Sequence, residues 1–247
     1  MPTLTEQFDR WVAEVRSTDP GTAILAHFAL ADFLANVGSL DEARSHLTGA
    51  DALIESSKLE KHEVPSLLLL VRIIFRRGRE AEARILLGRA RDQIRRQGPP
   101  LLGRLSEIEQ AAGLFRLGKI AEARTALQSV GRAEDLVLPE ADAVRLAWLA
   151  AVFARDGAGL HKALERSSAL PGRFLHFECS WALAQFYLEL GNEDNAREYA
   201  LEAATVLQSL AAELPVRYRK AFWQDERRGF LLRGLQATLA GERTRRA

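Results

Sequence analysis

Gly78-Arg-Glu-Ala-Glu-Ala83 is one copy of a short phrase that decides the fold: a glycine, a few mostly polar residues and then an alanine. The other copies, one of them longer by a residue, are Gly38–Ala43, Gly118–Ala123, Gly157–Ala163 and Gly191–Ala196. Successive glycines are 40, 40, 39 and 34 residues apart. A period in this range is typical of stacked helical repeats, in which each unit contacts only its neighbours.

The composition agrees with helical repeats. Of the 247 residues, 47% are hydrophobic and 27% are charged, as in ordinary soluble globular proteins. Alanine, leucine, arginine and glutamate dominate, and these residues favour helices. Stretches rich in valine, isoleucine and threonine, which favour strands, are missing. We therefore predict an all-α fold.

Proline and glycine mark the expected helix boundaries. Thr3 and Glu6 form a capping-box pattern, and Asp19-Pro20 supplies an N-cap followed by a proline at the first helical position. In each unit the glycine suits the left-handed residue that ends one helix, and the alanine suits a close crossing with the next. We predict a single domain, an α–α superhelix of about five hairpins. The hairpins are expected at residues 19–58, 64–98, 100–133, 139–170 and 171–212, between an N-terminal helix in 1–18 and C-terminal capping helices in 213–240.

A shared packing pattern runs through these units. In the first helix a large residue and a smaller one precede another large residue: Leu30-Ala31 with Leu34, Leu70-Val71 with Ile74, Leu149-Ala150 with Phe153, and Leu183-Ala184 with Tyr187. In the second helix the alanine of the phrase is followed by further apolar residues, such as Leu47, Leu87 and Leu127. The pattern resembles the tetratricopeptide repeat (TPR) family over about residues 20–212.

The resemblance implies a protein-binding array in which the first helix of each hairpin lines a concave face. Its loose spacing is similar to that of repeats in bacterial signalling and transcription regulators. The TPR clamp for carboxylate tails needs lysine and asparagine, whereas Phe28 and Asp32 stand at the first pair of positions. That specialised activity is therefore not expected.

Counting back from each glycine along the first helix predicts a partner-binding face. The candidate residues are Asp32, Asn36, Arg72, Phe75, Arg76, Phe115, Arg116, Arg155, Trp181 and Gln185. Arginine and aromatic residues are typical of binding hot spots, and a row of guanidinium groups suits carboxylates or phosphates. The alternative is that these arginines face solvent and favour the helix dipole near helix C-termini.

Motifs for chemistry are weak. Gly113–Lys119 matches the start of a phosphate-binding loop, but Ile120 replaces the required serine or threonine, and the preceding segment has a helical pattern. His176, Glu178 and Cys179 are close enough in sequence for a metal site but have no distant partner ligands. The single cysteine excludes an internal disulfide. We expect no catalytic residue, no metal and no cofactor.

Three function hypotheses remain. The first is a non-enzymatic scaffold or adaptor that binds an acidic or amphipathic peptide segment in a concave groove. The second is a ligand- or peptide-sensing module of a bacterial kinase, ATPase or transcription regulator. The third is nucleic-acid binding, because residues 72–124 hold 13 Lys and Arg against 6 Asp and Glu. No secretory signal or membrane span is evident, since the most apolar stretch, Leu67–Phe75, is short and contains Arg72. We therefore expect a cytoplasmic protein that does not act at a membrane.

Overall fold

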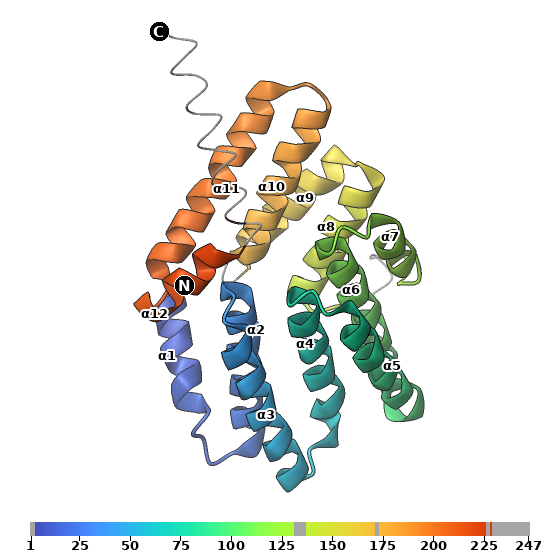
Figure 1. The fold of residues 1–247 in the computed structure, drawn as a ribbon, viewed down its shortest axis with the longest axis vertical. Helices are drawn as coiled ribbons and strands as arrows, with labels where there is room; N and C mark the ends of the chain where they lie inside the picture. Colours follow the sequence, from blue (N-terminus) through green and yellow to red (C-terminus); the bar gives the residue numbers. More distant parts are fainter. Residues whose placement is uncertain (1–2, 131–136, 171–172, 226–227, 229–247) are drawn as a thin grey trace.

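The computed structural model describes residues 3–130, 137–170, 173–225 and 228, and this part of the chain is all-α (Figure 1). The helices are α1 (Leu4–Glu14), α2 (Pro20–Val37), α3 (Leu40–Ser57), α4 (Glu63–Arg76), α5 (Glu80–Gln97), α6 (Pro100–Arg116), α7 (Ile120–Gln128), α8 (Glu140–Ala154), α9 (Gly157–Ser168), α10 (Phe174–Glu189), α11 (Glu193–Glu213) and α12 (Val216–Gln224). A short 3-10 helix, Glu60–His62, precedes α4. The predicted capping box at Thr3 and the N-cap at Asp19 are both formed.

Five antiparallel hairpins, from α2–α3 to α10–α11, make up most of the fold. Four of the five phrase glycines adopt the left-handed conformation, with φ of 91° at Gly38, 72° at Gly78, 76° at Gly118 and 71° at Gly191. The next residue then closes the turn; the Lys119 amide, for example, donates to the Leu114 carbonyl at 2.9 Å. The role predicted for these glycines is confirmed.

The fourth hairpin departs from the predicted register. Its left-handed residue is Arg155, with φ of 54°, and the Asp156 amide closes the turn on the Ala151 carbonyl at 2.9 Å. Gly157 instead begins α9. Counting back from Gly157 therefore assigned Arg155 to the wrong position: it lies in the turn and not on the inner face of α8. Helix α8 ends at Ala154, and its left-handed residue lies two residues before the glycine, so every position counted back from Gly157 is displaced by two residues.

The alanine of each phrase is buried near the start of the second helix of its hairpin. Ala43, Ala83 and Ala123 are fully buried, and Ala163 and Ala196 are 1% and 8% exposed. Their burial is consistent with the predicted packing role, which the following variant tests.

Ala123→Leu is expected to lower the free energy of unfolding by about 1–3 kcal/mol, because the larger side chain overpacks the α6–α7 crossing. Urea unfolding followed by circular dichroism measures this change. Ala121→Leu is the matched control, since Ala121 is exposed on the same helix. Equal midpoints for Ala123→Leu and the parent would contradict the packing argument.

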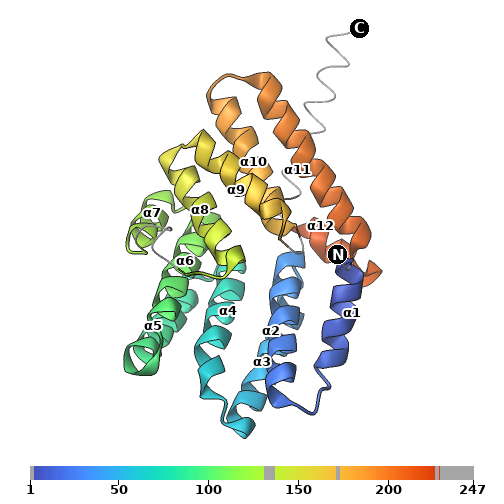
Figure 2. The same cartoon turned by 180° about the vertical axis from the view of Figure 1, so that it is seen from behind.

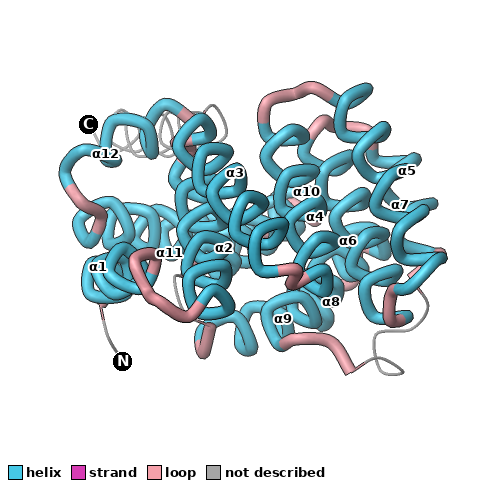
Figure 3. Tube along the Cα trace, turned by 90° about the horizontal axis from the view of Figure 1, so that it is seen from below, coloured by secondary structure: helices cyan, strands magenta, loops and turns pink. Residues whose placement is uncertain are grey.

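The two ends of the hairpin array meet, so the hairpins form a ring (Figures 1 and 2). Helix α1 packs against α2 and α11, and α12 packs against α2. One core cluster joins Phe8 of α1, Phe33 of α2, Leu207 of α11 and Tyr218 of α12. The ring centroid of Phe8 lies 5.3 Å from that of Phe33 and 5.6 Å from that of Tyr218. In the view from below, α1 and α11 lie together at one side of the molecule, and α5 and α7 lie at the opposite side (Figure 3).

Polar contacts reinforce the closure of the ring. The Tyr218 hydroxyl donates to Glu42 at 2.9 Å, and the Thr5 hydroxyl donates to the Glu213 carbonyl. Arg228 donates to the Asn36 carbonyl. The first helices of the hairpins therefore surround a cavity instead of lining the open groove expected for a row of stacked units. The second C-terminal helix expected before residue 240 lies outside the described residues.

Helix α2 is the one described helix that is long and apolar enough to cross a membrane by length and composition. Its apolar residues, such as Ile24, Leu30 and Leu34, lie in the core of the ring. This burial is compatible with a soluble protein.

Candidate functional site

The inner face of the ring encloses a central cavity of about 380 Å³. Helix α1, the first helix of every hairpin and Arg228 supply its walls. Its lining includes seven of the ten predicted partner-binding residues: Asp32, Asn36, Arg72, Phe75, Arg76, Phe115 and Arg116. The positions counted back from the turn glycines therefore identified residues of three hairpins that line one cavity.

An ion-pair network of arginines and carboxylates forms part of the cavity wall. Arg72 pairs with Asp32 and with Glu109, and Arg145 donates to Glu109 at 2.8 Å. Glu109 is 5% exposed. Burial raises its pKa, but Arg72 and Arg145 outweigh this and hold the pKa below its usual value. The pKa of Asp32 is likewise lowered, because the nearby arginines outweigh its burial.

Arg76 follows Arg72 by one turn of α4 and differs from it in its polar contacts. Its guanidinium donates to the Ala35 carbonyl at 2.8 Å and to the Asn36 side-chain oxygen at 2.6 Å. No ion pair joins it to a described Asp or Glu. Burial, together with the positive charges of Arg116 and Arg228, lowers the pKa of Arg76 well below its ordinary value. The electrostatic environment therefore disfavours its charge.

Arg116 and Arg228 lie near Arg76 together with two carboxylates. Arg116 lies 3.6 Å from Glu178 of α10 and 3.6 Å from Asp225. Arg228 donates to the Phe222 carbonyl at 3.1 Å, and its guanidinium lies 4.2 Å from the centre of the Phe222 ring. The C-terminal segment thus helps to build the cavity wall as well as to close the ring.

Trp148 of α8 lines the cavity with its ring, and its indole nitrogen is buried. The residue is 6% exposed, and its indole N–H has no hydrogen-bond acceptor within the described part of the chain. Leaving a buried donor unsatisfied costs about 1–3 kcal/mol. Phe115 contacts its ring edge-on at 5.5 Å.

Phe75 lines the cavity but serves mainly as a core residue. It is 1% exposed, and its ring lies against Gly113, where an added Cβ would come within 2.3 Å of it. The glycine therefore leaves room for this ring. Gly113, part of the false phosphate-loop match, has a packing role.

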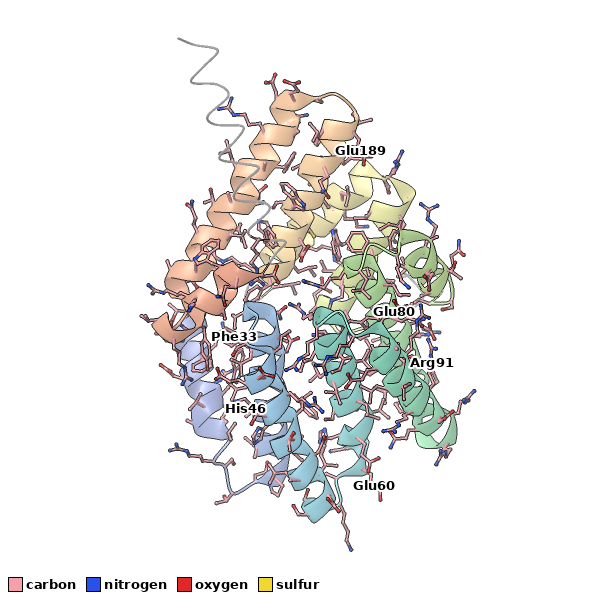
Figure 4. All side chains as sticks on the ribbon, in the orientation of Figure 1. Phe33, His46, Glu60, Glu80, Arg91 and Glu189 are labelled. Atoms are coloured by element: carbon pink, nitrogen blue, oxygen red, sulfur yellow. The ribbon has the colours of Figure 1, made fainter. Side chains whose placement is uncertain are left out.

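The other three predicted residues lie elsewhere. Arg155, Trp181 and Gln185 line a smaller outer cavity of about 100 Å³ between α8 and α10. Arg155 is exposed and lies 3.6 Å from Glu189, which Figure 4 labels near the end of α10. The ten candidates therefore divide between two sites, with Phe115 bordering both.

Sequence reasoning missed four lining residues that determine the character of the central cavity. They are Glu109, Arg145, Trp148 and Arg228. Glu109 precedes Ala112 by about one helical turn, so extending the count along α6 would have found it. Arg145 and Trp148 were missed because the count back from Gly157 along α8 was displaced. Arg228 had no signal, since it reaches the cavity only because the ring closes.

The basic stretch of residues 72–124 does not form one unpaired positive face. Eight of its 13 Lys and Arg residues pair with described carboxylates. Several pairs join neighbouring hairpins, such as Arg77 with Asp41 and Lys119 with Glu80. Because these charges are paired within the protein, less of the positive charge is available to a nucleic acid.

Ser167, His176 and Glu202 form a chain of contacts like that of a serine hydrolase. The Ser167 hydroxyl lies 3.0 Å from His176 Nδ1, and His176 Nε2 lies 3.1 Å from Glu202. However, Ser167 is fully buried and donates to the Leu164 carbonyl at 2.6 Å. Its hydroxyl therefore has no exposed face for a substrate, and the chain of contacts links three helices.

The histidine and cysteine candidates separate in the fold. Glu178 faces Arg116, whereas Cys179 is fully buried, and burial raises the pKa of its thiol to about 12. His176 is engaged with Ser167 and Glu202. Among the described residues no group of three or more His, Cys, Asp or Glu could hold a metal ion.

A histidine pair joins α2 and α3 outside the cavity. His27 Nδ1 lies 3.1 Å from His46 Nδ1, and Figure 4 labels His46. Burial lowers the pKa of both rings, and the proximity of His27 lowers that of His46 further. Glu42 opposes this shift, and Arg217 adds to it.

The free energy of unfolding is expected to decrease as the pH is lowered below about 6.5, the ordinary histidine pKa. In that range the unfolded chain binds more protons than the folded one. The contribution of the neutral pair is fully present above that pH. His46→Gln should show a smaller loss of unfolding free energy between pH 7 and pH 5 than the parent. Urea unfolding at both pH values measures this. An unchanged loss would show that the pair is not responsible.

Comparisons with protein-family models, with curated proteins and with solved structures found no match. The TPR resemblance stays a prediction that rests on the packing positions of the repeats.

Proposed function

We propose that this chain is a non-enzymatic recognition module that binds an acidic ligand in its central cavity and has a regulatory role. The observation that carries the proposal is Arg76, which lines this cavity and has no carboxylate in ion-pair contact among the described residues. The cavity volume of about 380 Å³ lies in the range of small-molecule sites. Guanidinium groups favour carboxylates and phosphates. In this proposal the chain acts in the cytoplasm as a ligand sensor for a bacterial kinase, ATPase or transcription regulator.

The test is a thermal-shift survey of acidic metabolites and short acidic peptides, because a ligand that binds only the folded state raises the melting temperature. At least one acidic compound should stabilise the parent. No stabilisation by any member of the survey would contradict the proposal.

Arg76→Gln should abolish most of that stabilisation, because Arg76 lines the cavity and pairs with no carboxylate in the part of the chain that the structure describes. Arg155→Gln is the matched control, since Arg155 is 78% exposed and lies outside the central cavity. Arg76→Gln should also leave the unfolding free energy nearly unchanged or higher, because a buried unpaired charge is lost. The same ligand response in Arg76→Gln and the parent would exclude this arginine from the site.

Binding of a partner protein is a second candidate, with its own observation. Leu188 and Leu190, at the turn between α10 and α11, are each 64% exposed. They lie in sequence beside Gln185 and Glu189 of the outer cavity. An amphipathic segment would suit this end of the array. Loss of partner capture by Leu188→Ser, with capture retained by Arg76→Gln, would favour the scaffold function.

A further inference from the structure

A hollow between α5, α6 and the end of α7 is lined by three arginines. Arg91 of α5, which Figure 4 labels, is followed one turn later by Arg95, and Arg104 comes from α6. The hollow has a volume of about 360 Å³, within the range of small-molecule sites. We call it the basic hollow. Its lining shares no residue with the central cavity or with the smaller outer cavity.

The three guanidinium groups of the basic hollow are only partly engaged within the protein. Nη2 of Arg91 donates to Glu107 at 2.7 Å, whereas its Nη1 has no hydrogen-bond partner among the described residues. Arg95 pairs with Asp92, but these side chains are 75% and 52% exposed, so the pair contributes little to stability. Arg104 makes neither an ion pair nor a hydrogen bond with a described residue.

The other polar groups of the lining are already used. Ser106 and Ser129 each donate to the backbone carbonyl three residues earlier, at 2.6 Å in both cases. A serine hydroxyl has one O–H to donate, so the guanidinium groups are the side-chain donors left for a ligand. Glu107 is the one carboxylate within the described lining, and Arg91 pairs with it. The basic hollow therefore favours an anion over a cation or a neutral group.

The positions of the arginines favour a phosphate over a carboxylate. Arg91 and Arg95 are four residues apart on one face of α5, and Arg104 is on the next helix. A carboxylate has two oxygens and one charge, which a single guanidinium group binds in a bidentate pair. A phosphate monoester carries about −1.5 to −2 charges at pH 7 and has three terminal oxygens, so guanidinium groups of both helices can bind it at once. Ile94 and Pro100 add apolar surface beside them.

We propose that the basic hollow binds the phosphate group of a small phosphate monoester, with Arg95 and Arg104 as its main contacts and Arg91 as the third. Binding replaces the exposed pair of Arg95 with Asp92 by contacts to the phosphate. This site is separate from the central cavity, so the inference does not depend on the acidic ligand proposed there.

The experiment is isothermal titration calorimetry of the full chain at pH 7 with phenyl phosphate, benzoate and benzamide. These probes share the phenyl ring and differ in the charge and the oxygens of the head group. We expect phenyl phosphate to bind at least fivefold more tightly than benzoate, and benzamide to bind most weakly. Added salt should weaken the binding of phenyl phosphate, because it screens exposed charges.

Four variants locate the bound phosphate. Arg95→Gln and Arg104→Gln should each weaken the binding of phenyl phosphate at least fivefold. Arg89→Gln is the matched control, since Arg89 is exposed on the same helix, pairs with no described carboxylate and does not line the basic hollow. Arg76→Gln should also leave this binding unchanged, which separates the basic hollow from the central cavity.

Each adverse result has a separate meaning. Equal binding of phenyl phosphate and benzoate, or unchanged binding to folded Arg95→Gln and Arg104→Gln, would overturn the inference. Loss of binding in Arg76→Gln alone would assign the phosphate to the central cavity, which overturns the second site and agrees with the proposed function. No binding of phenyl phosphate would overturn the inference and leave the proposed function to its own survey.

A nucleic acid is the other source of phosphate groups that the experiment distinguishes. A single-stranded oligonucleotide contacts an extended surface, so Arg89→Gln would weaken its binding as much as Arg104→Gln does. Tighter binding of an oligonucleotide than of phenyl phosphate, with that equal dependence on both arginines, would overturn the small-ligand site.

Discussion

Glu109→Gln is expected to lower the free energy of unfolding by about 3–5 kcal/mol, the usual cost of removing one member of a buried charge pair. Glu109 is 5% exposed and contacts Arg72 and Arg145. The neutral amide would leave these two arginines with less negative charge beside them. Glutamine has the same shape as glutamate, so the charge accounts for the effect and a cavity does not.

Urea unfolding followed by circular dichroism at pH 7 measures this loss. Asp41→Asn is the matched control, because Asp41 pairs with Arg77 but its side chain is 97% exposed. Exposed pairs contribute little to stability, so no measurable change is expected there. A Glu109→Gln midpoint equal to that of the parent would show that the arginines of the cavity do not depend on this carboxylate.

Phe222→Ala is the second change with a large expected effect, about 3–5 kcal/mol, because it empties a fully buried site. Phe222 of α12 is 0% exposed and packs in the core cluster that joins both ends of the array. Phe174 and Trp223 contact its ring, and Arg228 lies over it. Loss of the Phe222 side chain should therefore weaken the contact between the two ends of the hairpin array as well as lower the global stability.

Two measurements separate these effects. Urea unfolding gives the change in stability, and small-angle X-ray scattering gives the radius of gyration, which should rise if the ring opens. Val216→Ala, on the same helix and 77% exposed in the parent, is the control and should change neither quantity. A destabilised Phe222→Ala variant with the scattering profile of the parent would indicate that α1 and α11 hold the ring without α12.

Local sequence signals predicted the hairpins because each signal acts over a few residues. A left-handed turn after a helix needs glycine for steric reasons, and Gly38, Gly78, Gly118 and Gly191 all meet that need. The same rule misled at Gly157, where Arg155 takes the left-handed position at some conformational cost. A count from a single glycine cannot reveal such a shift, because the helix end depends on packing as well as on local preference.

The candidate site was only partly predictable from the sequence. Its arginines on α4 and α6 follow from helical periodicity, since residues at corresponding positions before each turn point to the same side of stacked helices. Their state does not follow from it. Arg72 pairs with Glu109, 37 residues away, whereas Arg76 in the same helix bonds to the Ala35 carbonyl and the Asn36 side chain and pairs with no described carboxylate. Pairing over that distance depends on how neighbouring helices are placed.

The sequence by itself determined the all-α class, the hairpin unit, its turns and its close-packed alanines, because backbone sterics and helical periodicity act locally. The tertiary structure alone decided that the array closes on itself. Phe8, Tyr218 and Phe222 come from opposite ends of the chain, and their apolar surfaces are buried only when those ends meet. This closure is what converts a predicted groove into a cavity and brings Arg228 beside Arg76.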